Sequence, residues 1–335
     1  MHVVIIGFAS YDTAGKVIYE TDSATGSITA IPAKNISPYL VEGKDMAVVN
    51  RSKPLCDMPG IGIGNKPIDD GNYLFTPEEK AEFLQKEPSA MEFFRKWIGA
   101  EELINHGDKW CLWLGDCPPE KLTKMPQALA RVGAVRDFRL KSKSAPTQKL
   151  AQTPTRFHVE NMPKHNYLVI PRHSSETRVF IPIEYFSPEY VVGDSCLIIP
   201  DAKLYHFGIL SSAMHMAWVR QVCGRLKSDY RYSSKLVYNN YPWPEKPSEK
   251  QVRAVEEAAQ SVLDARKEFP QSTLAHLYNP LTMPPVLVKA HAALDRAVDA
   301  AYRTQPFPTE RLRVEFLFSL YETLTKPLLA KGKKK

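Results

Sequence analysis

No apolar run in this sequence approaches the length of a membrane span, and its opening residues lack the charged segment and cleavage site of a signal peptide. Cysteine is sparse: the five residues are an odd number and widely scattered, which argues for reduced thiols rather than disulfides. Cys111 and Cys117 are accompanied by no second Cys or His pair at zinc-site spacing. We therefore expect a cytoplasmic protein with no membrane partner and no structural metal.

Complete catalytic motifs are missing as well. The sequence contains no Walker A motif, no nucleophile elbow and no paired metal-ligand signature. The segment PGIGIGN at 59–65 looks like a glycine-rich phosphate loop, but prolines bracket it where such a loop needs a strand before it and a helix after it. The chain alone thus carries no complete active site, and whether it is an enzyme stays open.

The overall composition is that of a soluble globular protein. The 335 residues are 44% hydrophobic and 24% charged, and the length suggests two or three domains. The formal net charge is +7, and residues 121–150 contain eight Lys or Arg against one Asp. A segment this basic commonly contacts phosphate groups, and a solvated basic face explains it equally well. Both interpretations stay open on composition alone.

Two apolar runs near the N-terminus predict a β-hairpin. Residues 1–8, MHVVIIGF, are typical of a buried strand, and residues 15–21, GKVIYET, of its partner. A hairpin is not stable alone in water, so this one must complete a larger sheet. We expect that sheet either in a later part of the chain or upstream of Met1, in which case the sequence is truncated.

Capping boxes mark the starts of two helical regions. Thr76 with Glu79 predicts the first of two short helices over residues 76–105. Ser248 with Gln251 predicts a helix that runs to about residue 268. Two further amphipathic patterns follow it, so the C-terminal part of the chain is expected to be a small helical bundle.

Between these regions the pattern changes to strands. Short apolar runs from about 157 to 200, each closed by Pro or a polar break, predict β-strands. Residues 201–224 then predict one helix, capped by Asp201 and ended near Gly224, on which His206 and His215 are packing residues. The fold class expected is therefore α+β, with a mixed-sheet domain followed by a small α-helical bundle.

Several long motifs resemble one known protein family. They include KNISPYLVEG, KPLCDMPG, GNKPIDDGN, WCLWL, IPRHSSETRVFIPI, GRLKSDYRYS and MPPVLVKAHAALDRAVDAAY. Together they resemble the target-recognition and C-terminal domains of the MmeI-like (type IIL) restriction–modification enzymes, over essentially the whole chain. The resemblance implies terminal strands of a truncated methyltransferase domain at 1–45, a DNA target-recognition domain at 46–245 and a helical bundle at 246–335.

The same resemblance implies which cofactors and partners belong to this chain. In the family, the S-adenosylmethionine site, the catalytic Asn-Pro-Pro-Tyr loop and the nuclease would all lie before Met1. No cofactor is expected in this chain, and S-adenosylmethionine and Mg²⁺ are expected only in the complete enzyme. The expected partners are double-stranded DNA and an upstream methyltransferase and nuclease polypeptide.

The family also implies which residues read the DNA bases. Lys227 and Asp229 occupy the two positions that face the base pair 3′ of the methylated adenine. Lysine donates to O6 and N7 of guanine, while aspartate accepts from N4 of cytosine, so the two residues match one G·C pair. An exposed Lys–Asp ion pair contributes under about 1 kcal/mol, so stability alone is a poor reason for the arrangement.

The resemblance implies two more base-reading pairs. Arg172 with Asp194 again suggests a G·C pair, two positions 5′ of the adenine. Arg231 with Ser195 corresponds to the base pair between, which is left open because serine bonds to several bases. The expected partial site is 5′-GNAG-3′, with the adenine methylated.

Other basic residues are expected to contact phosphates, which sets register without reading sequence. These are Arg225, Lys235, Arg136, Arg139, Lys141 and Lys143. Tyr230 and Tyr232 are expected to pack or to contact phosphate rather than to stack on bases. Two alternatives stay open: a basic nucleic-acid or protein-interaction module without sequence preference, and an independent DNA methyltransferase.

Overall fold

The protein is described here by a computed structural model that covers residues 5–21 and 25–332. Its strands are β1 Lys16–Thr21, β2 Ile28–Ala33, β3 Gly62–Ile63, β4 Leu74–Phe75, β5 Phe94–Ile98, β6 Trp110–Leu112, β7 Tyr167–Pro171, β8 His173–Ser174, β9 Glu184–Phe186, β10 Val191–Val192, β11 Cys196–Pro200, β12 Gly224–Leu226 and β13 Asp229–Arg231. Its helices are α1 Pro77–Lys86, α2 Ala100–Asn105, α3 Pro119–Leu122, α4 Pro126–Leu140, α5 Ala145–Lys149, α6 Leu204–Leu210, α7 Ala213–Val222, α8 Glu249–Lys267, α9 Leu274–Leu277, α10 Pro285–Tyr302 and α11 Glu310–Gly332. The mixture of helices and strands confirms the α+β fold class.

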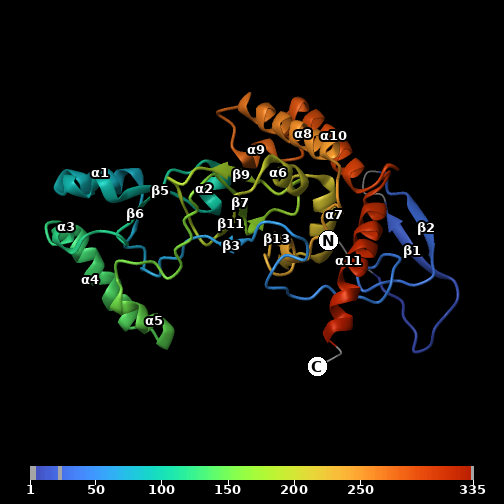
Figure 1. Cartoon of the computed structure of the whole chain (residues 1–335), viewed down its shortest axis with the longest axis horizontal. Coiled ribbons are helices and arrows are strands. Elements are labelled where there is room, and N and C mark those ends of the chain that lie inside the picture. The colour runs from blue at the N-terminus through green and yellow to red at the C-terminus, as the bar shows by residue number, and fades with distance from the viewer. Residues whose placement is uncertain (1–4, 22–24, 333–335) are drawn as a thin grey trace.

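Within the described residues the strands form four small sheets, ordered β1-β2, β10-β5-β6-β4, β3-β11-β7-β9 and β12-β13-β8. Apart from the parallel pair β10 and β5, the paired strands in these sheets are antiparallel. Figure 1 shows the second sheet with α1, α3, α4 and α5 at one end of the long axis, and β1-β2 at the other.

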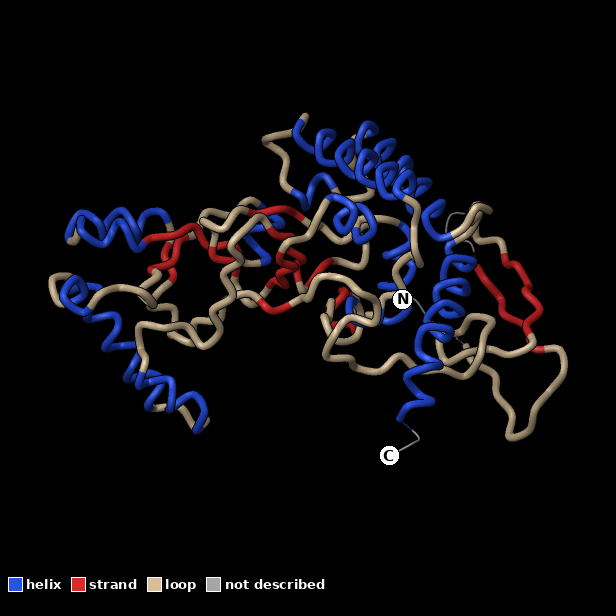
Figure 2. The backbone as a smooth tube through the Cα atoms, in the orientation of Figure 1, coloured by secondary structure: helices blue, strands red, loops and turns tan. Residues whose placement is uncertain are grey.

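In the part of the chain that the structure describes, buried apolar side chains form two hydrophobic cores. The smaller core lies in the lobe of residues 73–157, where aromatic side chains of β4 and β5 pack against α1 and α4, and Val191 of β10 joins it. The larger core joins the central β3-β11-β7-β9 sheet to α6, α7 and the C-terminal helices α8, α10 and α11. The C-terminal helices therefore share one hydrophobic core with the sheet. Figure 2 shows the path of the backbone through these helices and strands.

Both predicted capping boxes are confirmed. The Thr76 hydroxyl accepts from the Glu79 amide at 3.2 Å, and the Glu79 carboxylate accepts from the Thr76 amide at 2.8 Å. Ser248 and Gln251 make the same reciprocal pair at the start of α8. Of the two short helices predicted over 76–105, both form, but strand β5 lies between them and was not predicted.

The predicted N-terminal hairpin is wrong in its first strand. β1 pairs with β2, which follows it, and not with the run before it. Of that run, residues 1–4 lie outside the described residues, and residues 5–8 are exposed and form no strand. Apolar composition made this run resemble a strand, but a strand requires a hydrogen-bonded neighbour, and β1 takes β2 instead.

The single helix predicted over 201–224 is also wrong, because it breaks into α6 and α7. The hydroxyl of Ser212 donates to the Ile209 carbonyl at 2.7 Å and accepts from the His215 amide at 3.3 Å. One serine thus ends the first helix and caps the second. Asp201 is not the cap either; it has a φ of 55°, and Lys203 occupies the N-cap of α6.

The C-terminal helices hold α7 at both ends. A carboxylate oxygen of Asp295 on α10 accepts from the Ala213 amide at 2.7 Å, at the first turn of α7. Near the other end, Arg220 donates to Glu310 at the start of α11. Since α7 leads directly into β12, the C-terminal helices position the chain segment that follows α7.

His215 ties α7 to the end of β13. Because a carbonyl only accepts, Nδ1 of His215 donates to the Leu210 carbonyl at 2.8 Å, and Nε2 then accepts from the Tyr232 hydroxyl at 3.0 Å. Burial lowers the pKa of His215 to about 4. The packing role predicted for this histidine is therefore confirmed.

We expect His215 to make the fold sensitive to acid. Its folded pKa of about 4 lies below its ordinary value of 6.5, so its contribution is complete above pH 6.5 and is lost as the pH falls toward 4. Relative to His215→Gln, wild-type protein should lose roughly 3 kcal/mol of unfolding free energy over that range. Denaturant titrations at a series of pH values measure this difference.

The comparison with His215→Gln is needed because a second buried group, Asp295, makes the protein more stable as the pH falls. Burial raises the pKa of Asp295 to about 6, so its contribution to stability grows as the pH falls through 6. A difference between wild type and His215→Gln that does not change with pH would contradict the assignment. His165→Ala is the matched control for the loss of an imidazole at an exposed position.

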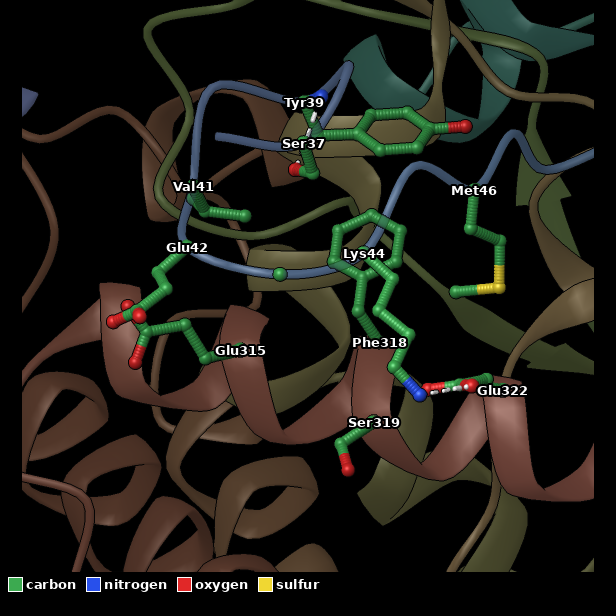
Figure 3. Close-up of a pocket in the computed structure, with 11 residues that line it drawn as sticks. Ser37, Tyr39, Val41, Glu42, Lys44, Met46, Glu315, Phe318, Ser319 and Glu322 are labelled. Carbon is green, nitrogen blue, oxygen red and sulfur yellow. Dashed lines mark hydrogen bonds and ion pairs between the residues drawn. The ribbon is translucent and has the colours of Figure 1, made fainter. Parts of the chain in front are cut away.

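A cavity of about 190 Å³ lies where the segment before β3 crosses α11 (Figure 3). Tyr39 stacks on Phe318 at 4.5 Å, and Lys44 pairs with Glu322 at 2.8 Å across the junction. None of the residues predicted to read DNA lines this cavity.

Three further features characterise the residues that the structure describes. No helix combines the length and apolar character that crossing a membrane requires. Among the described residues, no group of three or more His, Cys, Asp or Glu side chains is arranged so that it could hold a metal ion. All five thiols are free, and Cys111, Cys196 and Cys223 are buried.

Candidate DNA interface

The GRLKSDYRYS segment forms the β12-β13 hairpin. Leu226 pairs with Asp229, so only Lys227 and Ser228 make the turn. A two-residue hairpin loop needs at least one positive φ, which Gly, Asn and Asp adopt most readily. Here Lys227 adopts it, with φ of 55°, a conformation uncommon for a long side chain. The tip of the hairpin therefore carries an exposed lysine at a position where the backbone of the turn would favour Gly, Asn or Asp.

Asp229 is not paired with Lys227. Among the described residues no ion pair joins the two, and a carboxylate oxygen of Asp229 instead accepts from the Glu176 amide at 3.1 Å. This bond fixes the carboxylate against the 175–178 loop and leaves its other lone pairs exposed. A local ion pair between Lys227 and Asp229 therefore does not hold this turn.

The two faces of the small β12-β13-β8 sheet differ sharply. Tyr230 and Ser174 pair across the strands and are buried, each 3% exposed. The alternate residues Asp229 and Arg231 are exposed on the other face. Tyr232, 1% exposed, is also buried, so Tyr230 and Tyr232 pack in the protein.

Arg172 joins the hairpin to a second group of predicted reading residues. Its amide donates to the Ser195 carbonyl at 3.0 Å, and its own carbonyl accepts from the Tyr232 amide at 2.8 Å. Its guanidinium donates to the Asp194 carbonyl at 3.0 Å. Backbone bonds thus bring residues near 172, 195 and 231 together, although the sequence separates them by up to about 60 positions.

Asp194 and Ser195 occupy the short turn between β10 and β11. Lys66 lies 3.7 Å from the Asp194 carboxylate, in a pair that is partly exposed. The exposed Ser195 hydroxyl accepts from the Ala100 amide at 2.9 Å, and its own proton remains available to another acceptor. Sequence patterns did not single out Lys66 or Glu176. Their partners, Asp194 for Lys66 and Asp229 for Glu176, lie far away in the chain.

The glycines of PGIGIGN have a structural role next to this turn. A Cβ added at Gly64 would lie 2.2 Å from the carbonyl oxygen of Gly193, and one added at Gly193 would lie 2.3 Å from the Trp97 ring. Asn65 also donates to the Val192 carbonyl at 2.9 Å. The segment forms β3 against β11, and no helix begins directly after it, since β4 comes before α1. It is therefore a close backbone contact that supports Asp194 and not a helix-capped phosphate loop.

Gly64→Ala should therefore destabilise the protein by about 1–3 kcal/mol, because the obstacle is backbone that cannot rotate away. Gly133→Ala is the matched control: its added Cβ meets nothing within 4 Å on the helix α4, and it should stabilise by about 0.5–1 kcal/mol. Thermal or denaturant unfolding of both variants checks the pair. Equal effects of the two substitutions would show that the close contact is unimportant.

The residues predicted to bind phosphate divide into two groups. Exposed side chains belong to Arg136, Lys141, Lys143, Arg225 and Lys235. The guanidinium of Arg225 lies 3.9 Å from the Tyr230 ring and donates to the Ser228 carbonyl. These five residues are placed to meet an anion, and their contact with DNA stays a prediction.

Arg139 is the exception, and its prediction as a phosphate ligand is wrong. It is fully buried, and its five N–H groups all donate to backbone carbonyls at 2.8–3.1 Å. These carbonyls belong to Pro67, Ile68, Leu150, Thr153 and Arg156. Periodicity could have identified it, since Ala128, Val132, Val135 and Arg139 are the buried face of α4.

Comparison with protein families finds two adjoining matches. Residues 42–245 match the family described as MmeI, target recognition domain, and residues 247–329 match the family described as MmeI, C-terminal domain. One curated relative, DNA methyltransferase A of Bacillus subtilis (strain 168), is 40% identical over 323 residues. That alignment covers 96% of this chain and 36% of the relative.

A solved structure is similar over nearly the whole chain. The type IIL restriction–modification enzyme MmeI in complex with DNA aligns with a TM-score of 0.87 and 46% sequence identity. The alignment covers 94% of this chain and 42% of that one. The chain thus spans less than half the length of each of these two proteins.

Proposed function

Because the chain belongs to the family of MmeI target recognition and C-terminal domains, we propose that it reads the sequence of double-stranded DNA for an adenine-N6 methyltransferase and restriction enzyme. The relatives named above, a DNA methyltransferase and a restriction–modification enzyme bound to DNA, support the choice of nucleic acid as the partner. The chain supplies specificity, and S-adenosylmethionine and the nuclease metal would be held by the upstream part of the complete enzyme.

One observation carries this proposal: the predicted reading residues belong to segments that backbone hydrogen bonds hold together. Arg172 bonds through its backbone to both Ser195 and Tyr232, next to Arg231. Residues that only solvate a surface have no reason to converge from three separate segments. Side chains that must contact successive base pairs in one groove do need this fixed arrangement.

The chemistry of each pair then suggests part of a recognition site. Lys227 and Asp229 match a G·C pair 3′ of the modified adenine, as donor to guanine and acceptor from cytosine. Arg172 and Asp194 match a second G·C pair by the same logic. Arg231 and Ser195 correspond to the pair between, so the proposed partial site is 5′-GNAG-3′.

Selection of the full chain against a randomised duplex library, at near-physiological salt, tests the proposal. Enrichment of sites containing 5′-GNAG-3′ is the expected result, and the enriched sequences would also supply the flanking bases. Retention without enrichment, with affinity set by salt alone, would instead identify a basic module without sequence preference. No retention at any salt concentration would exclude both.

A further inference from the structure

Strand pairing places one more side chain among the predicted reading residues. His173 lies directly opposite Arg231 in the antiparallel pair of β8 and β13. Cross-strand partners have Cβ atoms about 4.5–5.5 Å apart and point to the same face of the sheet. That face is the exposed one, since His173 and Arg231 are exposed while their neighbours Ser174 and Tyr230 are buried.

His173 also follows Arg172 directly in the chain. Arg172 is bonded to Ser195 on one side and to Tyr232 on the other, so His173 stands between the two groups of reading residues. Its imidazole makes no hydrogen bond to any residue that the structure describes. Both ring nitrogens are therefore available to a ligand.

The surroundings of His173 favour its neutral form. Partial burial, followed by the charges of Arg172 and Arg231, lowers its pKa, while Asp229 acts weakly in the opposite direction. A neutral imidazole donates from one nitrogen and accepts at the other, which suits the edge of a base pair. A phosphate ligand would favour the protonated form, and the adjacent arginines oppose that form.

We propose that His173 is a further base-reading residue, which contacts the same base pair as Arg231 and Ser195. This inference rests on the proposed function and deepens it. Arg231 and Ser195 alone leave the identity of that base pair open. His173 would be a third side chain that selects it. The residue was invisible to sequence reasoning because only the strand register brings it next to Arg231.

The test uses four duplexes that differ only at the base pair between the two proposed G·C pairs. Competition binding of the full chain to these duplexes gives the wild-type preference. In His173→Ala, that preference should weaken by about fivefold, the loss expected for one hydrogen bond, while preference at the two flanking G·C pairs is retained. Thermal unfolding of the variant should match wild type, because the side chain is exposed.

Two control variants separate the alternatives. His165→Ala removes an exposed histidine that pairs with Asp201 at 3.0 Å outside this sheet, and it should change nothing. Lys235→Ala should lower affinity for all four duplexes equally, as removal of a phosphate contact does.

Three results would overturn the inference. One is an unchanged preference in His173→Ala, and another is an equal loss of affinity for all four duplexes. The third is a wild-type protein that reads the flanking pairs but not this one. A wild type with no preference at any of the three pairs would instead contradict the proposed function itself.

Discussion

A protein carrying both Lys227→Glu and Asp229→Arg should prefer cytosine over guanine at the position 3′ of the modified adenine. The exchange moves the acceptor to the place of the donor and the donor to the place of the acceptor, so the variant matches a C·G pair. Each good base contact contributes ~1–3 kcal/mol of discrimination, so we expect a guanine preference of about 5- to 150-fold to become a similar preference for cytosine. Competition binding with duplexes varied only at this pair measures the change.

The structure indicates that the hairpin tolerates this exchange. Both residues are exposed, and the pairing of Leu226 with Asp229 depends on backbone atoms alone. The Glu176 amide loses its acceptor when Asp229 is replaced, but at an exposed position water takes over that bond at little cost.

The single substitutions Lys227→Ala and Asp229→Ala are the controls for this experiment. Each should weaken the preference for guanine without creating a new one. A folded double variant that still prefers guanine would refute the assignment of these two residues. Loss of all preference, with binding retained, would count against base reading by this pair.

Arg139→Ala should destabilise the protein by at least about 4 kcal/mol and unfold the lobe of residues 73–157. The substitution deprives one buried and four partly buried carbonyls of their donor and leaves a cavity where the buried side chain stood, and each buried group left unsatisfied costs about 1–3 kcal/mol. Arg139→Lys should rescue only part of this loss, since an ammonium group has three donors in place of five. Denaturant unfolding monitored by tryptophan fluorescence, with Trp97, Trp110 and Trp113 in the lobe, measures the effect.

Arg136→Ala is the matched control on the same helix. Arg136 is exposed, so its removal should change stability by less than about 0.5 kcal/mol. If Arg136 contacts phosphate, affinity should fall equally for all sequences, and the slope of log affinity against log salt should decrease by about 1. Comparable losses of stability in Arg136→Ala and Arg139→Ala would contradict the distinction between the two residues.

Local patterns in the sequence predicted much of the fold. The capping boxes at Thr76 and Ser248 form as expected, because each depends on side chains three residues apart. The apolar runs that predict strands over 157–200 contain β7 and β11, which are almost completely buried. The amphipathic patterns that follow α8 become α10 and α11, because a helix with one apolar face needs only a core to pack against.

Predictions failed where a distant partner decided the outcome. The break between α6 and α7 depends on Ser212, and also on Asp295 from α10, which accepts from the first amide of α7. Arg139 seemed suited to phosphate because it is an arginine in a basic segment. Carbonyls of residues up to 72 positions away bind it instead.

The sequence by itself determined which side chains can donate to or accept from a base, where helices begin, and, through its long motifs, which family the chain belongs to. Tertiary structure alone decided which of those side chains share one exposed face. Strand register set His173 beside Arg231, and the backbone of Arg172 joined the hairpin to the turn at Asp194. The physical reason is that helix caps and hydrophobic periodicity act over a few residues, whereas register and burial depend on contacts between segments far apart in the chain.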